Sequence, residues 1–324
     1  MRILVTGGAG FIGSHVVDGL VAQGAEVAVF DNLSTGRPEF VHPAARFFAG
    51  DLTHEGDIES CVAAFRPEVV DHHAAQIDVR RSVEDPVHDA RTNVLGTLAL
   101  LESCSRHGVR KLIYASTGGA LYGEARFLPA TEEHPIHPES PYGVSKHAVE
   151  HYLYLWRLLH RLDYTALRYG NVFGPRQNPH GEAGVNAIFI GMMLAGKRPR
   201  VFGDGQQVRD YLYVEDVVSA NLLALSRGGG ETLNLGSGTG TSVNEIVHEL
   251  NAILGTRLDP IHEPPRPGEI QRIYLDARRA REVLGWEPRV SFRDGLRRTV
   301  EWFRARQPGR ETGPPRSPRT TAST

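Results

Sequence analysis

The sequence predicts an α/β fold, with a Rossmann-type, doubly wound parallel sheet and a smaller C-terminal lobe. Short apolar runs alternate with segments of helical periodicity through the first 170 residues, which is the pattern of βαβ units. A glycine-rich turn at residues 7–13 joins the first apolar run to the first helical segment. After Asn171, glycine and proline become frequent and the regular alternation is lost.

The elements of the first half follow in order from apolar runs and helical periodicity. Short apolar runs predict buried strands at 3–6, 26–30, 45–49, 68–72, 111–116 and 165–169. Apolar residues that recur at helical spacing predict helices at 14–23, 90–107 and 142–162. Together these elements predict an N-terminal domain over residues 1–170.

The second half predicts a smaller lobe over residues 171–303, with some later strands returning to the first domain. Helical stretches at 187–195, 214–225 and 243–254 are separated by turns, and the glycine- and proline-rich segment 174–181 predicts a loop. Residues 304–324 are rich in proline and arginine and carry almost nothing apolar. Such a segment buries too little surface to offset its ordering entropy, so a flexible tail is predicted.

Composition excludes several classes of protein. Of 324 residues, 40% are apolar and 23% charged, and a net charge of −2 gives no reason to expect nucleic acid or a membrane as partner. The chain has no run of 18 apolar residues, and its N-terminus does not resemble a signal peptide. Cys61 and Cys104 are too few for a disulfide framework and fit small buried side chains. We therefore expect a cytoplasmic protein.

The glycine-rich turn predicts a dinucleotide site. The spacing G-x-x-G-x-x-G over 7–13 lets the backbone approach a diphosphate at a helix N-terminus. Asp31 ends the second predicted strand, where an acid accepts a hydrogen bond from the adenosine ribose and disfavours a 2′-phosphate. NAD is therefore favoured over NADP, although Arg37 nearby weakens that preference. Asp51 follows the third strand, near the expected adenine edge, but an ordinary helix cap would explain it equally well.

A tyrosine and a lysine four residues apart predict a proton-transfer site. On a helix, Tyr142 and Lys146 share one face. A nearby ammonium favours the phenolate form of a tyrosine, which can take a proton from a sugar hydroxyl. Thr117 follows the fifth predicted strand, and its hydroxyl can hydrogen-bond the substrate oxygen as charge develops there. Without this context, a surface tyrosine and a solvated lysine would be the plainer interpretation.

These motifs, taken together, resemble a known family. The segments that carry the resemblance, besides the glycine turn and the residues above, are 73–76, 168–176, 202–205, 209–211, 214–217, 234–238 and 266–269. In their order and spacing they resemble the extended short-chain dehydrogenase/reductases of the NAD-dependent epimerase/dehydratase family. The resemblance is close to the UDP-glucose 4-epimerase branch and runs from residue 1 to about residue 303.

The resemblance implies NAD as cofactor and a UDP-sugar as substrate. Tyr142 would be the base, Lys146 its electrostatic partner and a ribose ligand, and Thr117 the group that orients the substrate. The residues implied for NAD binding are Gly7, Gly10, Phe11, Ile12, Gly13, Asp31, Asn32, Ser34, Gly36, Asp51, Leu52, Ala74, Ala75, Gln76, Asn93, Tyr142, Lys146 and Tyr169. The residues implied for substrate binding are Ser116, Thr117, Asn171, Val185, Phe202, Arg209, Arg266 and Glu269. Within this second set, the two arginines would bind the diphosphate, and the valine, phenylalanine and glutamate would frame the uridine.

The implied reaction is reversible 4-epimerisation of a UDP-hexose through a transient 4-keto sugar. In the related 4,6-dehydratases an acidic pair follows the threonine, whereas two glycines stand here at 118–119. UDP-glucose and UDP-galactose are the default substrates by resemblance. A UDP-glucuronate/UDP-galacturonate pair stays open, because its carboxylate would need a cation such as Arg80, Arg81 or Arg176. A UDP-N-acetylhexosamine also stays open, since the position that controls room at C2 falls near Ile273.

Further expectations concern the oligomeric state, a non-catalytic alternative and metal binding. Relatives in this family pair through two long helices, which implies a homodimer through 90–107 and 142–162. A non-catalytic NAD sensor or a scaffold protein is the alternative from another class, because a fold alone does not imply activity. The adjacent His72 and His73 point apart on a strand and fit structural roles, and no metal site is expected.

Overall fold

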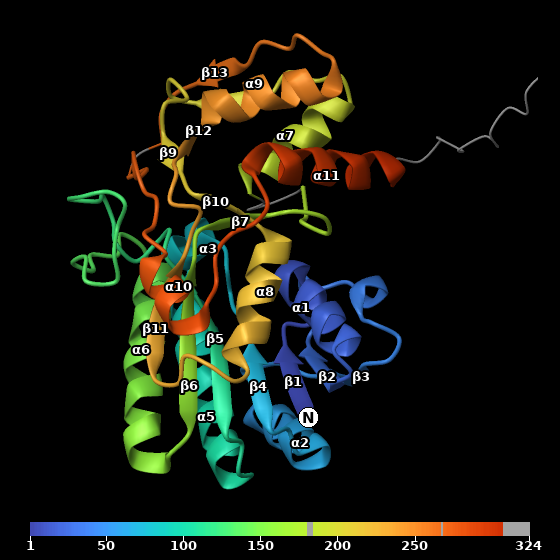
Figure 1. Ribbon diagram of the computed structural model, residues 1–324, viewed down its shortest axis with the longest axis vertical. Helices are drawn as coiled ribbons and strands as arrows, with labels where there is room; N and C mark the ends of the chain where they lie inside the picture. The colour runs from blue at the N-terminus through green and yellow to red at the C-terminus, as the bar shows by residue number, and fades with distance from the viewer. Residues whose placement is uncertain (180–183, 267, 307–324) are drawn as a thin grey trace, which may run out of the picture.

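A seven-stranded parallel sheet organises the computed structural model, which describes residues 1–179, 184–266 and 268–306 (Figure 1). Its strands are β1 (Arg2–Thr6), β2 (Glu26–Asp31), β3 (Arg46–Ala49), β4 (Val69–His72), β5 (Lys111–Thr117), β6 (Asp163–Tyr169) and β11 (Glu231–Leu235). The strand order is β11-β6-β5-β4-β1-β2-β3, and each neighbouring pair is parallel. The predicted doubly wound α/β fold is thereby confirmed.

Helices cover both faces of this sheet, which is why its central strands are nearly continuous apolar runs. One face carries α1 (Phe11–Ala22), α8 (Val214–Ala224) and α10 (Arg278–Leu284), and the other carries α2 (Glu55–Phe65), α5 (Gly96–Arg106) and α6 (Pro141–His160). Ile3 and Val5 of β1 pack into the first core, whereas Leu4 packs into the second. Successive side chains of a strand point to opposite faces, so one strand stabilises both cores.

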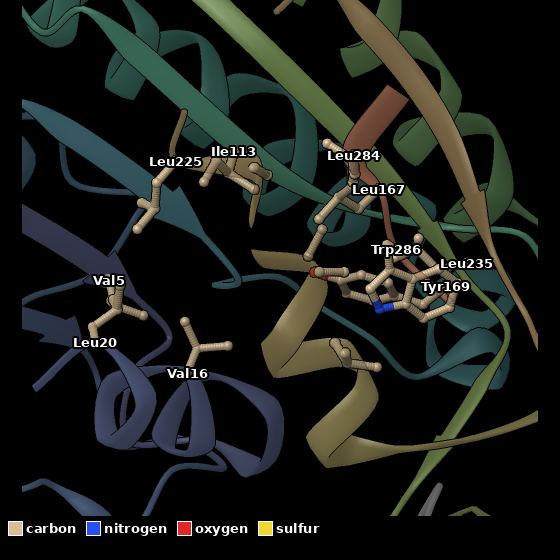
Figure 2. Close-up of a cluster of buried hydrophobic side chains, with 14 of the residues drawn as sticks. Val5, Val16, Leu20, Ile113, Leu167, Tyr169, Leu225, Leu235, Leu284 and Trp286 are labelled. Atoms are coloured by element: carbon tan, nitrogen blue, oxygen red, sulfur yellow. The ribbon is translucent and has the colours of Figure 1, made fainter. Parts of the chain in front are cut away.

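The first core extends from β1 to a segment near the end of the chain. Figure 2 shows Val5 and Leu20 at one end of the cluster and Trp286 at the other. Trp286 is fully buried, and its indole Nε1 donates hydrogen bonds to the Asp216 carbonyl oxygen and the Ser219 hydroxyl, each at 2.9 Å. The segment after α10 is therefore fixed to α8.

The smaller lobe lies beyond the carboxyl ends of the sheet strands (Figure 1). In the described residues it contains α7 (Val185–Leu194), α9 (Val243–Leu254), α11 (Phe292–Ala305) and pairs of short strands. The pairs are β7 (Asn171–Phe173) with β10 (Tyr211–Tyr213), β8 (Arg200–Phe202) with β13 (Ile261–Glu263), and β9 (Val208–Arg209) with β12 (Thr241–Ser242). A separate core of side chains such as Phe189, Ile246 and Leu296 holds the lobe together.

Several helix boundaries differ from those predicted. The helix predicted at 14–23 begins at Phe11, because Gly10 is its N-cap. The helix predicted at 90–107 begins earlier as α4 (Pro86–Ala90), passes through a π-helical turn η2 (Arg91–Leu95) and continues as α5. The sequence analysis does not predict α2, α3 (Val79–Glu84), the 3-10 turn η1 (Pro38–Phe40), α10 or α11.

The predicted tail begins too early. α11 continues to Ala305 because Phe303 packs against the core of the lobe. Residues 307–324 of the tail, and residues 180 and 181 of the predicted loop, lie outside the described residues. Within the described ranges, no helix combines the length and the apolar character that a membrane crossing requires.

The cysteines and the adjacent histidines occupy structural positions. Cys61 and Cys104 are free and buried, and burial raises the pKa of the Cys61 thiol to about 12. The ring nitrogens of His72 lie 2.6 Å from the Thr6 hydroxyl and 2.9 Å from the Thr97 hydroxyl. His72 therefore ties the end of β4 to β1 and α5.

Replacing Trp286 by alanine should lower the free energy of unfolding by about 3–5 kcal/mol, because it leaves a large cavity and removes the link to α8. Urea denaturation followed by far-UV circular dichroism would measure the loss. Trp286→Phe, which retains most of the ring volume, should cost clearly less than the alanine variant. Equal stability of the alanine variant and the wild type would contradict this account of the core.

Candidate active site

The candidate site lies at the point where the order of the sheet reverses. From β1 the chain builds β2 and β3 on one side, and β4, β5, β6 and β11 on the other. In open α/β sheets, ligands bind in the crevice at the carboxyl ends of the strands at such a switch point. Gly7 follows β1 here and packs directly against the segment that follows β4.

The glycine turn keeps this crevice free of side chains. Gly7 has a φ of +68°, and a Cβ there would stand 2.7 Å from the Ala74 nitrogen. A Cβ at Gly13 would collide with the Gly7 carbonyl oxygen. Gly10 caps α1 without a side-chain hydrogen bond, and the first turn carries no acid. The amides at the start of α1, among them those of Phe11 and Ile12, thus have no intrahelical acceptor and can bind an anion such as a diphosphate.

Asp31 stands at the end of β2 and holds the turn in place. Its Oδ2 accepts a hydrogen bond from the Ala9 amide at 3.0 Å, and its Oδ1 accepts one from the Leu33 amide at 2.8 Å. Burial raises the pKa of Asp31, while these two hydrogen bonds lower it. A Cβ at Gly36 would stand 2.8 Å from Oδ1, so the loop can pass this close to the carboxylate only as glycine.

The segments after β2 and β3 are linked by a second carboxylate. Asp51 accepts a hydrogen bond from the Asn32 side chain at 2.7 Å, and Asn32 in turn accepts one from the Ser34 amide at 2.9 Å. Leu52 is buried in the core between the sheet and α2. The residues predicted for the adenosine side of a dinucleotide are thus brought together at one edge of the sheet.

The segment after β4 is fixed by a reciprocal pair of hydrogen bonds. The Gln76 amide donates to Asn93 Oδ1 at 2.8 Å, and Asn93 Nδ2 donates to the Gln76 carbonyl oxygen at 3.0 Å. Asn93 Nδ2 also lies within hydrogen-bond distance of Asp89 and of the Ser145 hydroxyl. Asn93 lies in the π-helical turn and is fully buried, so it positions the backbone around Ala74 and Ala75 next to α6.

The structure brings Tyr142, Lys146 and Thr117 together as predicted from their spacing. Ser140 caps α6 by accepting a hydrogen bond from the Gly143 amide, and Tyr142 lies in the first turn. The Thr117 hydroxyl, at the end of β5, lies near enough to the Tyr142 phenol to lower the pKa of that phenol. Lys146 Nζ donates to the Ala115 carbonyl oxygen at 2.8 Å and lies 6.0 Å from the centre of the Tyr142 ring.

Burial controls the protonation of both groups. It lowers the pKa of Lys146 to about 8, against the opposing effect of the Asp89 and Glu150 carboxylates. It raises the pKa of Tyr142 strongly, and Asp89 adds to the rise while the Thr117 hydroxyl reduces it. In the chain alone Tyr142 is therefore protonated at neutral pH. Desolvation therefore dominates the pKa of Tyr142, rather than the Lys146 ammonium that the sequence analysis expected to lower it.

A buried ion pair supports this group, and the sequence analysis misses it. Arg168 on β6 donates to both oxygens of Glu150 on α6, at 2.9 and 2.6 Å, and to the Tyr122 hydroxyl at 2.8 Å. The Ser116 hydroxyl donates to Glu150 at 2.7 Å. Despite burial, hydrogen bonds from Arg168, His147 and Ser116 hold the pKa of Glu150 at about 2. The Ser116 hydroxyl, which the resemblance implies for substrate binding, therefore binds another residue of the chain. The one sequence signal for Glu150 is its position one helical turn after Lys146, on the same face of the helix.

Two further implied residues, Tyr169 and Asn171, differ in their surroundings. The Tyr169 hydroxyl is buried and exchanges hydrogen bonds with the Asn221 side chain at 3.0–3.1 Å, while its ring stacks on His73. Asn171 begins β7 and is exposed, with its Oδ1 3.3 Å from where a Cβ of Gly119 would stand. Asn171 therefore faces the open strand end, whereas Tyr169 is enclosed.

Four of the five residues implied for the nucleotide come together in the lobe. An open cavity of about 830 Å³ is lined by Phe202, Arg266 and Glu269, among others. The Arg266 guanidinium lies 3.8 Å from the centre of the Phe202 ring, and an Arg209 nitrogen lies 3.8 Å from a Glu269 oxygen. Val185 opens α7. A flat base and a diphosphate would find an aromatic ring and two guanidinium groups here.

The three arginines considered as partners for the carboxylate of a uronate are either paired with an acid or exposed. Arg176 donates to Asp18 on α1 at 2.6 Å. Arg80 and Arg81 are exposed on the short helix α3. Ile273 is buried beside Tyr122 in a small apolar cluster.

Comparison with known proteins places these features in context. A family model described as the NAD dependent epimerase/dehydratase family matches residues 3–236. A putative UDP-glucose 4-epimerase of Methanocaldococcus jannaschii is 48% identical over 302 residues, covering 93% of this chain and 98% of that protein. The crystal structure of a Thermotoga maritima UDP-glucose 4-epimerase with UDP-glucose superimposes with a TM-score of 0.93 at 50% identity, covering 94% of this chain and 99% of that one. The crystal structure of a Thermus thermophilus UDP-glucose 4-epimerase in complex with NAD superimposes with a TM-score of 0.90 at 47% identity, covering 95% of this chain and 100% of that one.

Replacing Glu150 by glutamine should lower the free energy of unfolding by about 3–5 kcal/mol, because Arg168 is left buried without a counter-charge. Glu231→Gln is the matched control, since Glu231 pairs with the half-exposed Arg279 and should cost less than about 1 kcal/mol. Chemical denaturation measures both. The pKa of Glu150 is lower in the folded chain than in the unfolded chain. The difference in unfolding free energy between wild type and Glu150→Gln should therefore be fully present at pH 7 and shrink as the pH falls from about 4 towards 2. A difference independent of pH would contradict the ion-pair explanation.

Proposed function

The chain belongs to the NAD dependent epimerase/dehydratase family, and on that premise we propose that it catalyses the reversible 4-epimerisation of UDP-glucose and UDP-galactose. The observation that carries the proposal is the meeting of Thr117, Tyr142 and Lys146 at the carboxyl edge of the sheet, beside the glycine turn. The lobe adds a cavity suited to a nucleotide diphosphate. A cytoplasmic location stays a prediction.

The residues around the switch point fit NAD. Backbone atoms stand where a Cβ of Gly7 or Gly13 would lie, so both positions require glycine. Because no side chain caps α1, the amides at its start are accessible to the cofactor diphosphate. Asp31 uses one lone pair of each oxygen on the turn and retains others for ribose hydroxyls. When bound, NAD⁺ supplies an acceptor for the hydride of sugar C4 and gives it back.

Tyr142 holds and moves the proton in this mechanism. Because burial keeps its phenol protonated in the chain alone, the base form requires positive charge close by, part of which Lys146 provides. The Thr117 hydroxyl lies beside the phenol and favours its ionised form. From there Tyr142 takes the proton of the sugar O4 as C4 becomes a ketone, and returns it to O4 after the opposite face has been presented.

The lobe holds the nucleotide while the sugar turns. Arg209 and Arg266 bind the diphosphate with charge-assisted hydrogen bonds, and the Phe202 ring packs against the uracil. The sugar has no such anchor and can rotate about its bond to the diphosphate. Either face of C4 then reaches the same phenol, which is what 4-epimerisation requires.

The strand end after Thr117 favours epimerisation over dehydration. A 4,6-dehydratase needs acids there to remove the C5 proton and to protonate the departing C6 hydroxyl. Gly118 and Gly119 stand there instead, and a Cβ at Gly118 would meet the Leu275 side chain, which would have to move. A hexose also fits better than a uronate, since Arg176 is already paired with Asp18.

We also infer a homodimer. Val144, Tyr154, Leu155, Leu158 and Leu159 of α6 are large apolar side chains that lie exposed along this helix. Contiguous exposed apolar surface of this kind marks an interaction site, and a twofold axis would let one face cover itself. Figure 1 shows α6 at the outer side of the sheet, where a second copy has access to it.

Replacing Tyr142 by phenylalanine should lower kcat by a factor of about 10²–10⁴, because the phenolic oxygen that carries the proton is lost. Proton NMR of UDP-glucose incubated with the purified protein, without added NAD, would follow appearance of the galacto anomer. NAD released on denaturation should be the same in variant and wild type. Tyr154→Phe, on the exposed side of the same helix, should leave kcat unchanged.

Three results of that assay would contradict the proposal. Turnover by Tyr142→Phe at the wild-type rate would show that another group is the base. Conversion of UDP-glucuronate but not UDP-glucose by the wild type would move the substrate to the uronate pair. If the wild type converts neither sugar with NAD present, a non-catalytic NAD-binding role becomes the better conclusion.

Replacing Leu158 by glutamate should convert a dimer to a monomer, because a charge would be buried in the centre of the proposed interface. Sedimentation velocity at micromolar concentration measures the state, and circular dichroism checks the fold. Ile261→Glu is the control, because Ile261 is also a partly exposed apolar side chain but lies on β13 of the lobe, away from both helices. A monomeric wild type would contradict the proposed dimer.

A further inference from the structure

Two histidines on α6 converge in a way that the proposed reaction does not use. His147 and His151 are four residues apart on the helix and share one face. Their Nε2 atoms are 3.1 Å apart, and their ring centres are 4.5 Å apart with an interplanar angle of 66°. Lys146 points into the site on the buried side of α6, whereas the side chain of His147 is partly exposed and that of His151 is exposed.

The distance between the two nitrogens allows both to bind one metal ion. Imidazole nitrogens bind Zn²⁺ at 2.0–2.1 Å, so an ion about 2.05 Å from both Nε2 atoms would see them at an angle of about 98°. That angle lies between the roughly 90° of octahedral sites and the roughly 109° of tetrahedral ones. Both nitrogens can therefore bind one ion with little movement of either ring.

A carboxylate sets the tautomer that such a site needs. His147 Nδ1 lies 3.2 Å from Glu150 Oε2, so an N–H at Nδ1 donates to the carboxylate and leaves the Nε2 lone pair directed at His151. Metal-binding histidines characteristically donate their second ring nitrogen to a carboxylate in this way. Glu150 is in turn held by Arg168, which fixes the orientation of the His147 ring from the buried side of the helix.

We propose that His147 and His151 form a chelating site for a divalent transition-metal ion of the Zn²⁺, Ni²⁺ and Cu²⁺ class, which imidazole ligands favour. No group of three or more His, Cys, Asp or Glu side chains in the described residues could enclose an ion. The remaining coordination positions are therefore filled by water or by the same two histidines of a second copy. The latter is compatible with the proposed dimer, because His151 lies between Val144 and Leu155 on the face that the dimer would cover.

Zinc titration of the metal-free, full-length protein tests the site. Isothermal titration calorimetry with ZnCl₂ should show saturable binding, and His151→Ala and His147→Ala should each weaken it at least tenfold, since even the loss of an outer-shell partner costs metal sites 10–100-fold. His54→Ala is the matched control, because His54 is exposed and makes no histidine pair. MgCl₂ should not bind there, since Mg²⁺ prefers oxygen ligands.

The outcomes separate the site from the alternatives. Zinc binding that is unchanged in His151→Ala, or no saturable binding to the wild type, would overturn the proposal and leave the pair as a hydrogen bond between two rings. A stoichiometry of one zinc ion per chain supports water at the remaining coordination positions. A stoichiometry of half an ion per chain, rising to one ion per chain in Leu158→Glu, supports coordination by the histidines of a second copy. In metal-free buffer His151→Ala should retain UDP-glucose turnover, so failure of the metal site and failure of the proposed function are distinguishable.

Discussion

The buried ion pair between Arg168 and Glu150 is the interaction on which the position of the site depends. Both side chains are almost completely buried, and charges removed from water stabilise a fold only where good geometry and further hydrogen bonds compensate their lost hydration. Here the guanidinium faces the carboxylate with two nitrogens, and the Ser116 hydroxyl satisfies a remaining lone pair. Ser116 precedes Thr117, and Glu150 follows Lys146 by one turn. The pair thereby sets where β5 and α6 meet, and with it the distance between the groups that share the proton.

Burial of the same region sets its chemistry. Desolvation favours the neutral form of both ionisable groups, so it raises the pKa of Tyr142 and lowers that of Lys146 to about 8. In a medium of low effective dielectric, one additional positive charge shifts such equilibria far more than it would in water. A cationic ligand beside Tyr142 would therefore convert a resting phenol into a base. Under the proposed function, this links proton transfer to the presence of the cofactor and keeps the chain alone inactive.

The sequence predicts those parts of the site that depend on local backbone and helical period. Gly7 and Gly13 are needed for one turn, and Tyr142 and Lys146 share a face because a helix repeats every 3.6 residues. The pairing of Arg168 with Glu150 depends on how α6 packs on the sheet, which no local pattern contains. The π-helical turn that places Asn93 against Gln76 adds one residue to a turn, and apolar periodicity does not register such an insertion. The spacing of His147 and His151 is visible in the sequence, but the 3.1 Å between their nitrogens follows from side-chain orientations that Glu150 helps to set.

The way the lobe is joined to the sheet domain explains how one phenol could serve both faces of a sugar. The nucleotide cavity belongs to a lobe with its own core, whereas Tyr142 stands on a helix packed against the sheet. The lobe is tied to the sheet, because β7 of the lobe follows β6 of the sheet after a single residue. Asp210, directly after Arg209, accepts hydrogen bonds from the Ser237 and Leu275 amides and so holds the strand that carries Arg209 to the segment after β11. A nucleotide bound in the lobe would therefore stay at a fixed distance from Tyr142. With both ends fixed, the sugar between them is the one part free to turn, so a change of configuration at C4 needs no change in the fold.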